Sequence, residues 1–307
     1  MSAGTGVAVV VVTYNRVELL ERVLDGLAAQ TRPADLVLVV DNGSTDATPA
    51  LLDRHPLAGL RTITQANLGG AGGFHRGVAE AMAAGAARIW LIDDDVVPAP
   101  DCLAQLLAHD EPCLISVRED LTGALVEKAA TRFDLRRPWV IKPKTGMVED
   151  AGSRAALAPL TPVENVAFEG FLVHRDVVAR IGLPDPAFFI FYDDVDYALR
   201  ARRAGYRIRA VRDAVLVRQL DFDQQHDLAG WKGYYMYRNL FVVHRRYGEN
   251  VLVRLKPWLI TLAVLLLAPL RGGRAEARNV VRALRDSAAL RELTPAARPG
   301  AVVADLS

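Results

Sequence analysis

The segment Trp90-Leu-Ile-Asp-Asp-Asp-Val96 joins an apolar run to three consecutive carboxylates. The apolar residues are typical of a buried strand, which would end where the acidic residues begin. In open α/β sheets, ligands bind at the carboxyl ends of the strands. Three carboxylates at such a place repel one another and lose hydration, so they require a cation or many hydrogen-bond donors. One interpretation is a divalent metal with an anionic ligand; the other is a solvated acidic turn or a helix N-cap.

The overall composition is that of an ordinary globular protein. The chain has 307 residues, of which 51% are hydrophobic and 24% charged, and its formal net charge is +1. This length accommodates one large domain plus a substantial extension, and the near-neutral charge gives no indication of a nucleic-acid partner. The only two cysteines, Cys102 and Cys113, fit a reducing compartment and argue against a disulfide framework or a cysteine-based zinc site. Residues 1–6 carry no signal-peptide pattern, so we expect a cytoplasmic protein.

Four strands that alternate with three helices in the first hundred residues predict the fold class. Residues Val7–Thr13 are continuously apolar and β-branched, as in a central parallel strand covered on both faces. Further strands are expected at 36–40, 60–64 and in the run that ends at Asp93, with helices at 17–29, before 55 and up to 84. Such βαβ units predict an α/β fold with a mostly parallel, mixed sheet flanked by helices.

The pattern loosens after residue 101. We expect a helix at 102–109, a strand at 114–117, short strands and loops at 121–149, and a strand at 168–174 with a short helix up to Ile181. An aromatic run at 185–192 leads into a helix at 193–203 whose first turn is acidic and whose last turn is basic, which matches the helix dipole. Two short strands, 207–211 and 214–217, would complete a catalytic domain that we assign to residues 1–225.

Residues 226–307 form a predicted C-terminal helical region. It contains a helix at 228–247, an apolar segment at 257–270 with basic residues on both sides, and a basic amphipathic helix at 278–291. The apolar segment is shorter than the roughly 20 residues of a membrane-spanning helix. These helices either pack on the catalytic domain or a second subunit, or lie in the membrane interface; we favour peripheral contact with the inner face of the cell membrane.

A glycine-rich loop, Asn67-Leu-Gly-Gly-Ala-Gly-Gly73, separates a predicted strand from a predicted helix. Glycines permit a bulky ligand to approach the backbone closely, and free N–H groups at a helix start suit an anion. The loop lacks the Gly-Lys-Ser/Thr of a P-loop and does not follow the first strand as a GxGxxG would, which disfavours an NTPase or a dinucleotide enzyme. The alternative is a loop that is merely flexible.

Polar residues also follow the first two strands. Asp41 ends the second strand, where it would either cap a turn or accept a hydrogen bond from a nucleobase. Thr13, Asn15 and Arg16 follow the first strand, and we expect these four residues to form one edge of a crevice.

The vicinal acids Asp193 and Asp194 follow the aromatic run. Mutual repulsion of neighbouring carboxylates raises the pKa of one of them and suits it to general base catalysis. The alternative is that both are simply favourable charges in the first turn of a helix.

Taken together, these segments resemble the inverting family 2 glycosyltransferases of the GT-A fold. Within that family, the glycine loop, the aromatic run and the later segment Tyr-Tyr-Met-Tyr-Arg-Asn239 are similar to bacterial galactofuranosyltransferases and rhamnosyltransferase-like enzymes. The resemblance covers about residues 7–206 and rests on the order and spacing of five segments: VVVVTYNR, VVDNGSTD, NLGGAGG, LIDDD and FFIFYDDVDYALRARRAGY.

The resemblance implies a role for each motif. Residues that follow the early strands would bind the nucleotide sugar, a UDP or dTDP derivative, and the aspartate triplet would be a DXD motif that holds Mn²⁺ or Mg²⁺. Asp194 matches the catalytic base, with Asp193 beside it. The implied donor-binding residues are Thr13, Asn15, Arg16, Asp41, Asn67, Gly69, Gly70, Gly73, Asp93 and Asp94; the metal ligands are Asp93 and Asp95; and the acceptor side holds Phe168, Glu169, Gly170, Phe171 and Trp231.

One departure from the family pattern concerns the metal. Galactofuranosyltransferases carry a metal-binding histidine upstream of the tryptophan matched by Trp231, and the same spacing leads here to Gln219. Either His226 supplies the missing ligand from a remodelled loop, or the metal is held by Asp95 and the diphosphate alone.

The function expected from these features is metal-assisted transfer of a sugar, with UDP-galactofuranose favoured as donor, to a hydroxyl of a glycan or lipid-linked acceptor. A transferase for dTDP-rhamnose or another hexose is the alternative within the family. A nucleotidyltransferase is disfavoured because Thr-Tyr-Asn-Arg16 stands where its glycine-rich loop would follow the first strand. A non-catalytic nucleotide-sugar-binding scaffold remains as the alternative from another class, and a homo-oligomer is compatible with the sequence.

Overall fold

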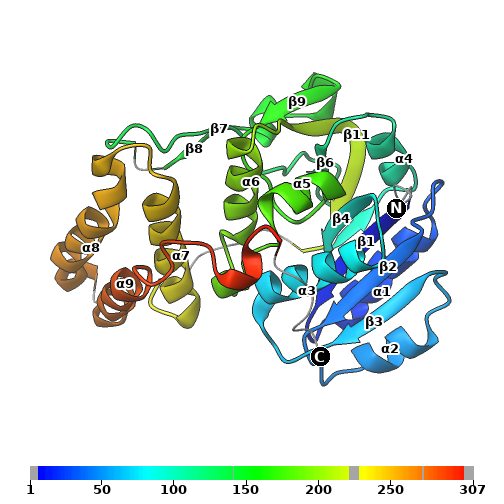
Figure 1. Cartoon of the computed structure of the whole chain (residues 1–307), viewed down its shortest axis with the longest axis horizontal. Coiled ribbons are helices and arrows are strands. Elements are labelled where there is room, and N and C mark those ends of the chain that lie inside the picture. Colours follow the sequence, from blue (N-terminus) through cyan, green and yellow to red (C-terminus); the bar gives the residue numbers. More distant parts are fainter. Residues whose placement is uncertain (1–5, 141, 221–227, 272, 301–307) are drawn as a thin grey trace.

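The computed structural model describes residues 6–140, 142–220, 228–271 and 273–300. Within these ranges, nine strands form one mixed sheet in the order β3-β2-β1-β4-β10-β6-β11-β5, and β9 pairs with β11 (Figure 1). Strands β1 to β4 are parallel, whereas β10 runs antiparallel between β4 and β6. This arrangement confirms the predicted α/β class. The strands are β1 Val7–Thr13, β2 Leu36–Asp41, β3 Leu60–Thr64, β4 Arg88–Asp93, β5 Val96–Pro98, β6 Cys113–Glu119, β9 Leu160–Val163, β10 Phe171–His174 and β11 Ile208–Arg218.

Helices cover both faces of the sheet because the central strands are apolar on both sides. In β1, Ala8, Val10 and Val12 belong to one core, while the alternating residues belong to the other. Helices α3 (Gly69–Ala83), α5 (Arg175–Ile181) and α6 (Asp193–Arg203) contribute to the first core. The second core is closed by α1 (Val17–Ala28), α2 (Thr48–Arg54) and α4 (Cys102–Leu107).

A two-stranded hairpin, β7 (Ala130–Phe133) and β8 (Lys144–Met147), lies beside the main sheet, as expected for the irregular 121–149 region. Short 3₁₀ helices are found at η1 (Val148–Ala151), η2 (Arg154–Ala156), η3 (Pro186–Phe188) and η4 (Pro295–Ala297). The two cysteines are buried and unpaired, one in α4 and the other in β6.

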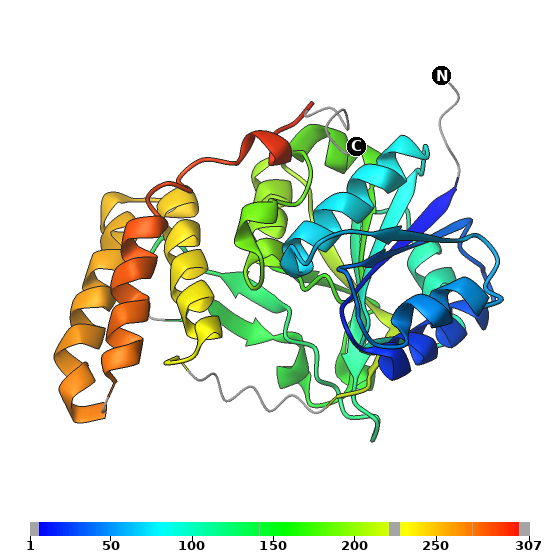
Figure 2. The same cartoon turned by 90° about the horizontal axis from the view of Figure 1, so that it is seen from below.

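Three C-terminal helices, α7 (Trp231–Tyr247), α8 (Val251–Arg271) and α9 (Arg274–Asp286), pack against one another beside α6 (Figures 1 and 2). After α9, residues 287–300 run back across the catalytic domain, as Figure 2 shows; we call this segment the C-terminal strap. Its η4 turn reaches α6, where the Arg200 guanidinium donates to the Ala297 carbonyl at 3.4 Å.

The structure corrects three predicted elements. The two strands expected at 207–211 and 214–217 are one strand, β11 (Ile208–Arg218), whose register against β6 shifts between Val211 and Val215. The apolar helix α8 begins at Val251 and has 21 residues, so the prediction that it is too short to span a membrane was wrong. Residues 251–268 are long and apolar enough to cross a membrane by length and composition alone, and 22% of this stretch is buried. The last helix ends at Asp286, five residues before the predicted end.

Candidate active site at the carboxyl end of β4

A cavity of about 510 Å³ opens at the carboxyl end of β4. Residues from widely separated parts of the sequence line it: Arg16, Gly70, Phe74, Asp93, Asp95, Ala167, Phe168, Glu169, Ile190, Phe191, Asp193, Asp194, Arg218, Gly230, Trp231 and Lys232. The ends of β4 and β11, the segment before β10 and the starts of α3, α6 and α7 therefore meet at one place. Parallel strands bring their carboxyl ends to one edge of a sheet, which is why these segments converge.

The carboxylates of β4 lie inside this cavity. Burial, with Glu169 and Asp95 nearby, raises the pKa of Asp93 well above its usual range. Burial, with Glu169 and Asp94 nearby, raises the pKa of Asp95 to about 6. The Oδ1 atom of Asp95 is buried and has no hydrogen-bond partner among the described residues. An acceptor in this state favours the approach of a cation.

Asp94 has a different environment from its neighbours. The Thr13 hydroxyl donates to its Oδ2 at 2.8 Å, and the Arg16 guanidinium donates to its Oδ1 at 2.9 Å. Arg16 also lies 3.5 Å from Asp95 and faces the cavity. Asp94 thus anchors the end of β1 to the end of β4, and of these three residues only Arg16 lines the cavity.

Asn15 and Asp41 organise the loop after β2. The Asn15 side chain accepts from the backbone N–H of Thr45 at 2.7 Å, and Asp41 Oδ1 accepts from the Ser44 N–H at 2.9 Å. Asn15 has a φ of 53°, which an asparagine adopts more readily than most residues. Both side chains are thus engaged within the loop, and of the four residues predicted to form a crevice edge only Arg16 lines the cavity.

The glycine-rich loop forms the first turn of α3. Gly69 has a φ of +72°, and a Cβ there would lie 2.1 Å from the Phe189 carbonyl oxygen. Gly73 is required for packing instead, since its Cβ would lie 2.3 Å from Val12 of β1. Gly70 faces the cavity, whereas the Asn67 side chain is turned back to accept from the Gly69 N–H at 3.0 Å.

Asp193 and Asp194 begin α6 and line the same cavity. Burial and the Asp194 charge raise the pKa of Asp193 well above its usual range. Burial also raises the pKa of Asp194, although the Lys144 ammonium of β8 offsets part of this effect. A carboxylate with a raised pKa is a stronger base than an ordinary aspartate.

The predicted acceptor-side residues separate into two groups. Phe168 and Glu169 line the cavity, as does Trp231, which is 59% exposed. Phe171 is fully buried in the core between β4 and β6, and Gly170 packs against Leu216 and Ser116, so neither lines the cavity. The cavity thus takes Phe168 and Glu169 from the segment before β10, whereas β10 itself begins with the buried Phe171.

Sequence reasoning missed an arginine pair around Glu169. The Arg118 guanidinium forms two 2.9 Å bonds to Glu127 and a further bond to Glu169, and Arg218 donates to Glu169 at 3.0 Å. Burial would raise the pKa of Glu169, but Arg118 and Arg218 outweigh it and hold this pKa below its usual value. Arg218 is detectable as a charged residue at a strand end, whereas Lys144 lies in the irregular hairpin and has no sequence signal.

A complete metal-binding group is not formed by the described part of the chain, which has no cluster of three or more histidine, cysteine or acidic residues arranged around one ion. His226 lies outside the described residues. Gln219 does not face the cavity; its N–H donates to the Asp95 carbonyl at 2.8 Å and thus joins the end of β11 to the acidic turn.

The family assignment comes from the sequence as a whole. The model of the family described as "Glycosyltransferase like family 2" matches residues 4–232. The chain belongs to this family. It is a glycosyltransferase, and the matched residues contain every segment that lines the cavity.

The relatives of this chain include three bacterial sugar transferases. Galactofuranosyltransferase GlfT1 of Mycolicibacterium smegmatis is 34% identical over 200 residues, which is 65% of this chain and 66% of the relative. GlfT1 of Mycobacterium tuberculosis is 33% identical over 219 residues, or 70% of each chain. The N-acetylglucosaminyl-diphospho-decaprenol L-rhamnosyltransferase of the same species is 27% identical over 64% of this chain and 71% of its own.

Solved glycosyltransferase structures share the fold. A mannosyltransferase from Pyrobaculum calidifontis in complex with GDP-mannose and Mn²⁺ superposes with a TM-score of 0.54 at 24% identity, over 96% of this chain and 78% of its own. GalNAc-T7 with UDP, GalNAc and Mn²⁺ gives a TM-score of 0.61 at 12% identity, over 91% and 55% of the two chains. These similarities confirm the predicted GT-A fold.

Proposed function

We propose that this protein is an inverting, metal-dependent transferase that moves galactofuranose from UDP to a hydroxyl group of a glycan or lipid-linked acceptor. One observation carries the proposal: carboxylates from the end of β4 and from the start of α6 face a single cavity, together with Arg16 and Arg218. The first pair suits a metal-bound diphosphate, and the second suits an acceptor hydroxyl. Stabilisation of the departing diphosphate and removal of the acceptor proton, the two tasks of an inverting transfer, are thus assigned to separate residues.

The residues at the end of β4 fit a divalent metal. Asp95 offers a buried oxygen without a hydrogen-bond partner among the described residues, and Asp93 lies beside it. Carboxylate and phosphate oxygens are the ligands that Mg²⁺ and Mn²⁺ prefer. When bound, such an ion would stabilise the negative charge of the departing diphosphate. Arg16 would contribute a further positive charge on this side.

Asp194 is the proposed general base. The acceptor oxygen forms a bond to the anomeric carbon while the bond from that carbon to the diphosphate breaks, and the acceptor proton passes to the Asp194 carboxylate. The raised pKa of Asp194, caused mainly by burial, favours this proton transfer. Phe168 and Trp231 supply apolar surface for a sugar acceptor beside the base.

The Asp194→Asn variant tests this role. We expect the transfer rate to fall by about 10² to 10⁴-fold, because the amide cannot accept the proton while its shape is retained. The dissociation constant for UDP with Mn²⁺ should stay within about threefold, since Asp194 contributes no donor contact in the proposal. A transfer rate within a fewfold of the wild type would exclude Asp194 as the base.

The choice of UDP-galactofuranose rests on the relatives, which are named galactofuranosyltransferases at 33–34% identity and a rhamnosyltransferase at 27%. A thermal-shift screen of UDP-galactofuranose, UDP-galactopyranose, UDP-glucose and dTDP-rhamnose, each with and without Mn²⁺, tests the donor. The largest Mn²⁺-dependent shift should come from UDP-galactofuranose. A larger shift with dTDP-rhamnose would replace the donor in the proposal while leaving the site unchanged.

We also propose that α8 rests on a membrane surface at the inner face of the cell membrane. Leu255, Trp258, Leu259, Leu262 and Leu266 are exposed and follow one another at helical spacing on one face of α8. The opposite face packs inward, where the Lys256 ammonium donates to the Arg137 and Val140 carbonyls of the β7–β8 loop. Trp139 of that loop is also exposed, and tryptophan favours the membrane interface.

A further inference from the structure

The turn that precedes Asp193 and Asp194 has an unusual backbone. Phe189, Phe191 and Tyr192 have φ values of 63°, 67° and 66°, and none of them is a glycine. Residues other than glycine rarely adopt this left-handed backbone conformation, and they keep it only where the surrounding structure holds them in it. Tyr192 is the residue from which α6 begins, so the backbone of this turn sets the direction in which the two carboxylates enter the cavity.

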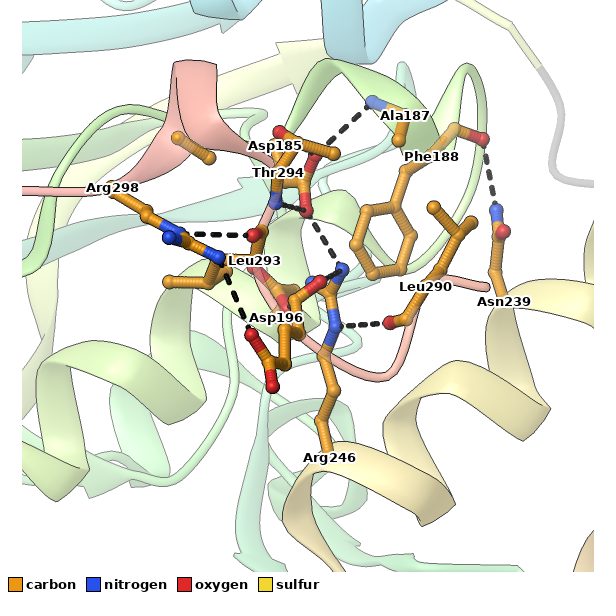
Figure 3. Close-up of polar contacts among 12 residues, drawn as sticks. Asp185, Ala187, Phe188, Asp196, Asn239, Arg246, Leu290, Leu293, Thr294 and Arg298 are labelled. Atoms are coloured by element: carbon orange, nitrogen blue, oxygen red, sulfur yellow. Dashed lines mark hydrogen bonds and ion pairs between the residues drawn. The ribbon is translucent and has the colours of Figure 1, made fainter. Parts of the chain in front are cut away.

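Asn239 of α7 holds this turn through its side-chain amide. The Nδ2 group donates to three carbonyls of the turn, those of Phe188 at 3.0 Å, Ile190 at 2.8 Å and Phe191 at 2.9 Å; Figure 3 shows the first of these. Asn239 is fully buried and does not line the cavity. Any effect of Asn239 on the cavity must therefore pass through the turn that it holds.

Arg238 fixes the orientation of this amide. Its Nε donates to the Asn239 Oδ1 at 2.8 Å, which leaves the Nδ2 end to face the turn. The same guanidinium donates to the carbonyls of Ala187 at 2.6 Å and Phe188 at 2.9 Å. Because an arginine can only donate, the amide can only be placed in one way.

The other side of the turn is joined to the glycine-rich loop. The Ala71 N–H donates to the Phe189 carbonyl at 3.1 Å, and the missing side chain of Gly69 makes room for that carbonyl. The turn is thus held between α3, which begins with the glycine-rich loop, and α7, which belongs to the C-terminal helical region.

We propose that Asn239 is a positioning residue for Asp194: by holding three carbonyls of the left-handed turn, it directs the base toward the acceptor. The C-terminal helical region is then a structural part of the catalytic centre. This proposal rests on the proposed role of Asp194, but its first step, the restraint of the turn, can be measured without any turnover.

Hydrogen exchange followed by mass spectrometry measures that first step. In the Asn239→Ala variant, amides of peptides covering residues 187–194 should exchange at least tenfold faster than in the wild type. The matched control is Tyr237→Phe, two residues earlier on α7, which removes a buried 2.5 Å bond to Glu276 of α9. Exchange at 187–194 that is unchanged in Asn239→Ala, or equally accelerated by both variants, would overturn the proposal.

A double-mutant cycle measures the second step. The readout is the rate of UDP release from UDP-galactofuranose with Mn²⁺, with water as the acceptor. Asn239→Ala should lower kcat at least thirtyfold with little change in KM, Asn239→Ser should lie between it and the wild type, and Tyr237→Phe should retain the wild-type kcat. Asn239→Ala should add no further loss to Asp194→Asn, because both changes act on the same group.

The cycle separates the two proposals. If Asp194→Asn keeps the wild-type rate, the base assignment under the proposed function fails, whatever happens at Asn239. If Asp194→Asn is slow and Asn239→Ala slows it further by its full single-variant factor, Asn239 acts independently of the base and the positioning role fails. An equal change of kcat in Asn239→Ala and Tyr237→Phe would show a general effect of destabilising α7, which also contradicts the proposal.

Discussion

At Gly69 the glycine-rich loop lies close to the turn before α6. Two factors restrict this position, a left-handed φ and the Phe189 carbonyl oxygen, which a Cβ would approach to 2.1 Å. Gly85 provides a matched position, because it has a φ of +82° but no atom within 4 Å of its would-be Cβ. The pair therefore separates backbone strain from steric overlap.

We expect Gly85→Ala to lower the free energy of unfolding by about 1–2 kcal/mol, the cost of a left-handed alanine. Gly69→Ala should cost about 2 kcal/mol more, because the Phe189 carbonyl must also move. Urea denaturation of both variants measures the difference. Equal losses in the two variants would show that the close contact at Gly69 contributes nothing.

Several site residues were predictable one by one, and others were not. Asp93, Asp95 and Asp194 line the cavity because they lie at or just after the end of a strand, or in the first turn of a helix, and such places are visible in the sequence. The pairing of Asp94 with Thr13 and Arg16 was not predictable, since it joins residues 78 and 81 positions apart. Phe171 was predicted on the acceptor side but is buried, because the sequence does not show where the segment that lines the cavity ends and the buried strand β10 begins.

At the scale of elements, α7 fixes the segment that runs from η3 into α6. Beyond the Asn239 contacts, the Arg246 guanidinium donates to Asp185 and Asp196, both at 2.9 Å, and to carbonyls of the C-terminal strap, as Figure 3 shows. Both aspartates are fully buried. A buried charge that loses its partner is strongly destabilising, so this network joins α6, α7 and the strap into one unit.

His244 makes the stability of α7 dependent on pH. Burial, together with the nearby Lys256, lowers the pKa of His244 from 6.5 to about 4, and the Leu240 carbonyl offsets only part of this. Between pH 6.5 and 4 the unfolded chain binds more protons at this site than the folded chain does. The stability contributed by the neutral histidine is therefore complete above pH 6.5 and is lost as the pH falls toward 4.

We expect His244 to account for about 2 kcal/mol of stability lost between pH 7.5 and pH 5. The measurement compares denaturant unfolding of the wild type and His244→Leu at both pH values. Other titrating groups are common to the two proteins, so their contributions cancel in the comparison. The variant should lose about 2 kcal/mol less than the wild type; an identical pH dependence would contradict this account.

The sequence predicted the elements of the sheet better than those beside it. The early strands were predictable because they are covered on both faces and thus continuously apolar. β11 was predicted as two strands because Arg212 and Asp213 interrupt its apolar pattern, yet β6 pairs with it on both sides of the interruption. The start of α8 was not predicted because the charged residues Arg254 and Lys256 interrupt the apolar pattern in its first turns.

At the scale of the whole molecule, the proposed membrane contact of the apolar face of α8 can be tested by substitution. Leu259→Ser, Leu262→Ser and Leu266→Ser, combined in one chain, should lower binding to phosphatidylglycerol-rich vesicles by at least about tenfold, since each serine removes apolar surface that the lipid would bury. Leu121→Ser is the control, because this leucine is exposed in a loop away from α8. Vesicle sedimentation measures the bound fraction.

The same variants test the alternative occupant of this face. If α8 pairs with a second copy of the chain, the triple variant will change the oligomeric state in sedimentation velocity while vesicle binding remains that of the wild type. That result would contradict the membrane proposal.

The central claim is that the cavity at the end of β4 binds a nucleotide diphosphate through a divalent metal held by Asp95. The most direct test is calorimetric titration of UDP with Mn²⁺ or EDTA into the wild type, Asp95→Ala and the control Asp110→Ala, whose carboxylate is on the surface. Mn²⁺ should tighten UDP binding at least about tenfold in the wild type and the control, and this gain should vanish in Asp95→Ala. Equal UDP affinity with Mn²⁺ and with EDTA, or an undiminished gain in Asp95→Ala, would contradict the claim.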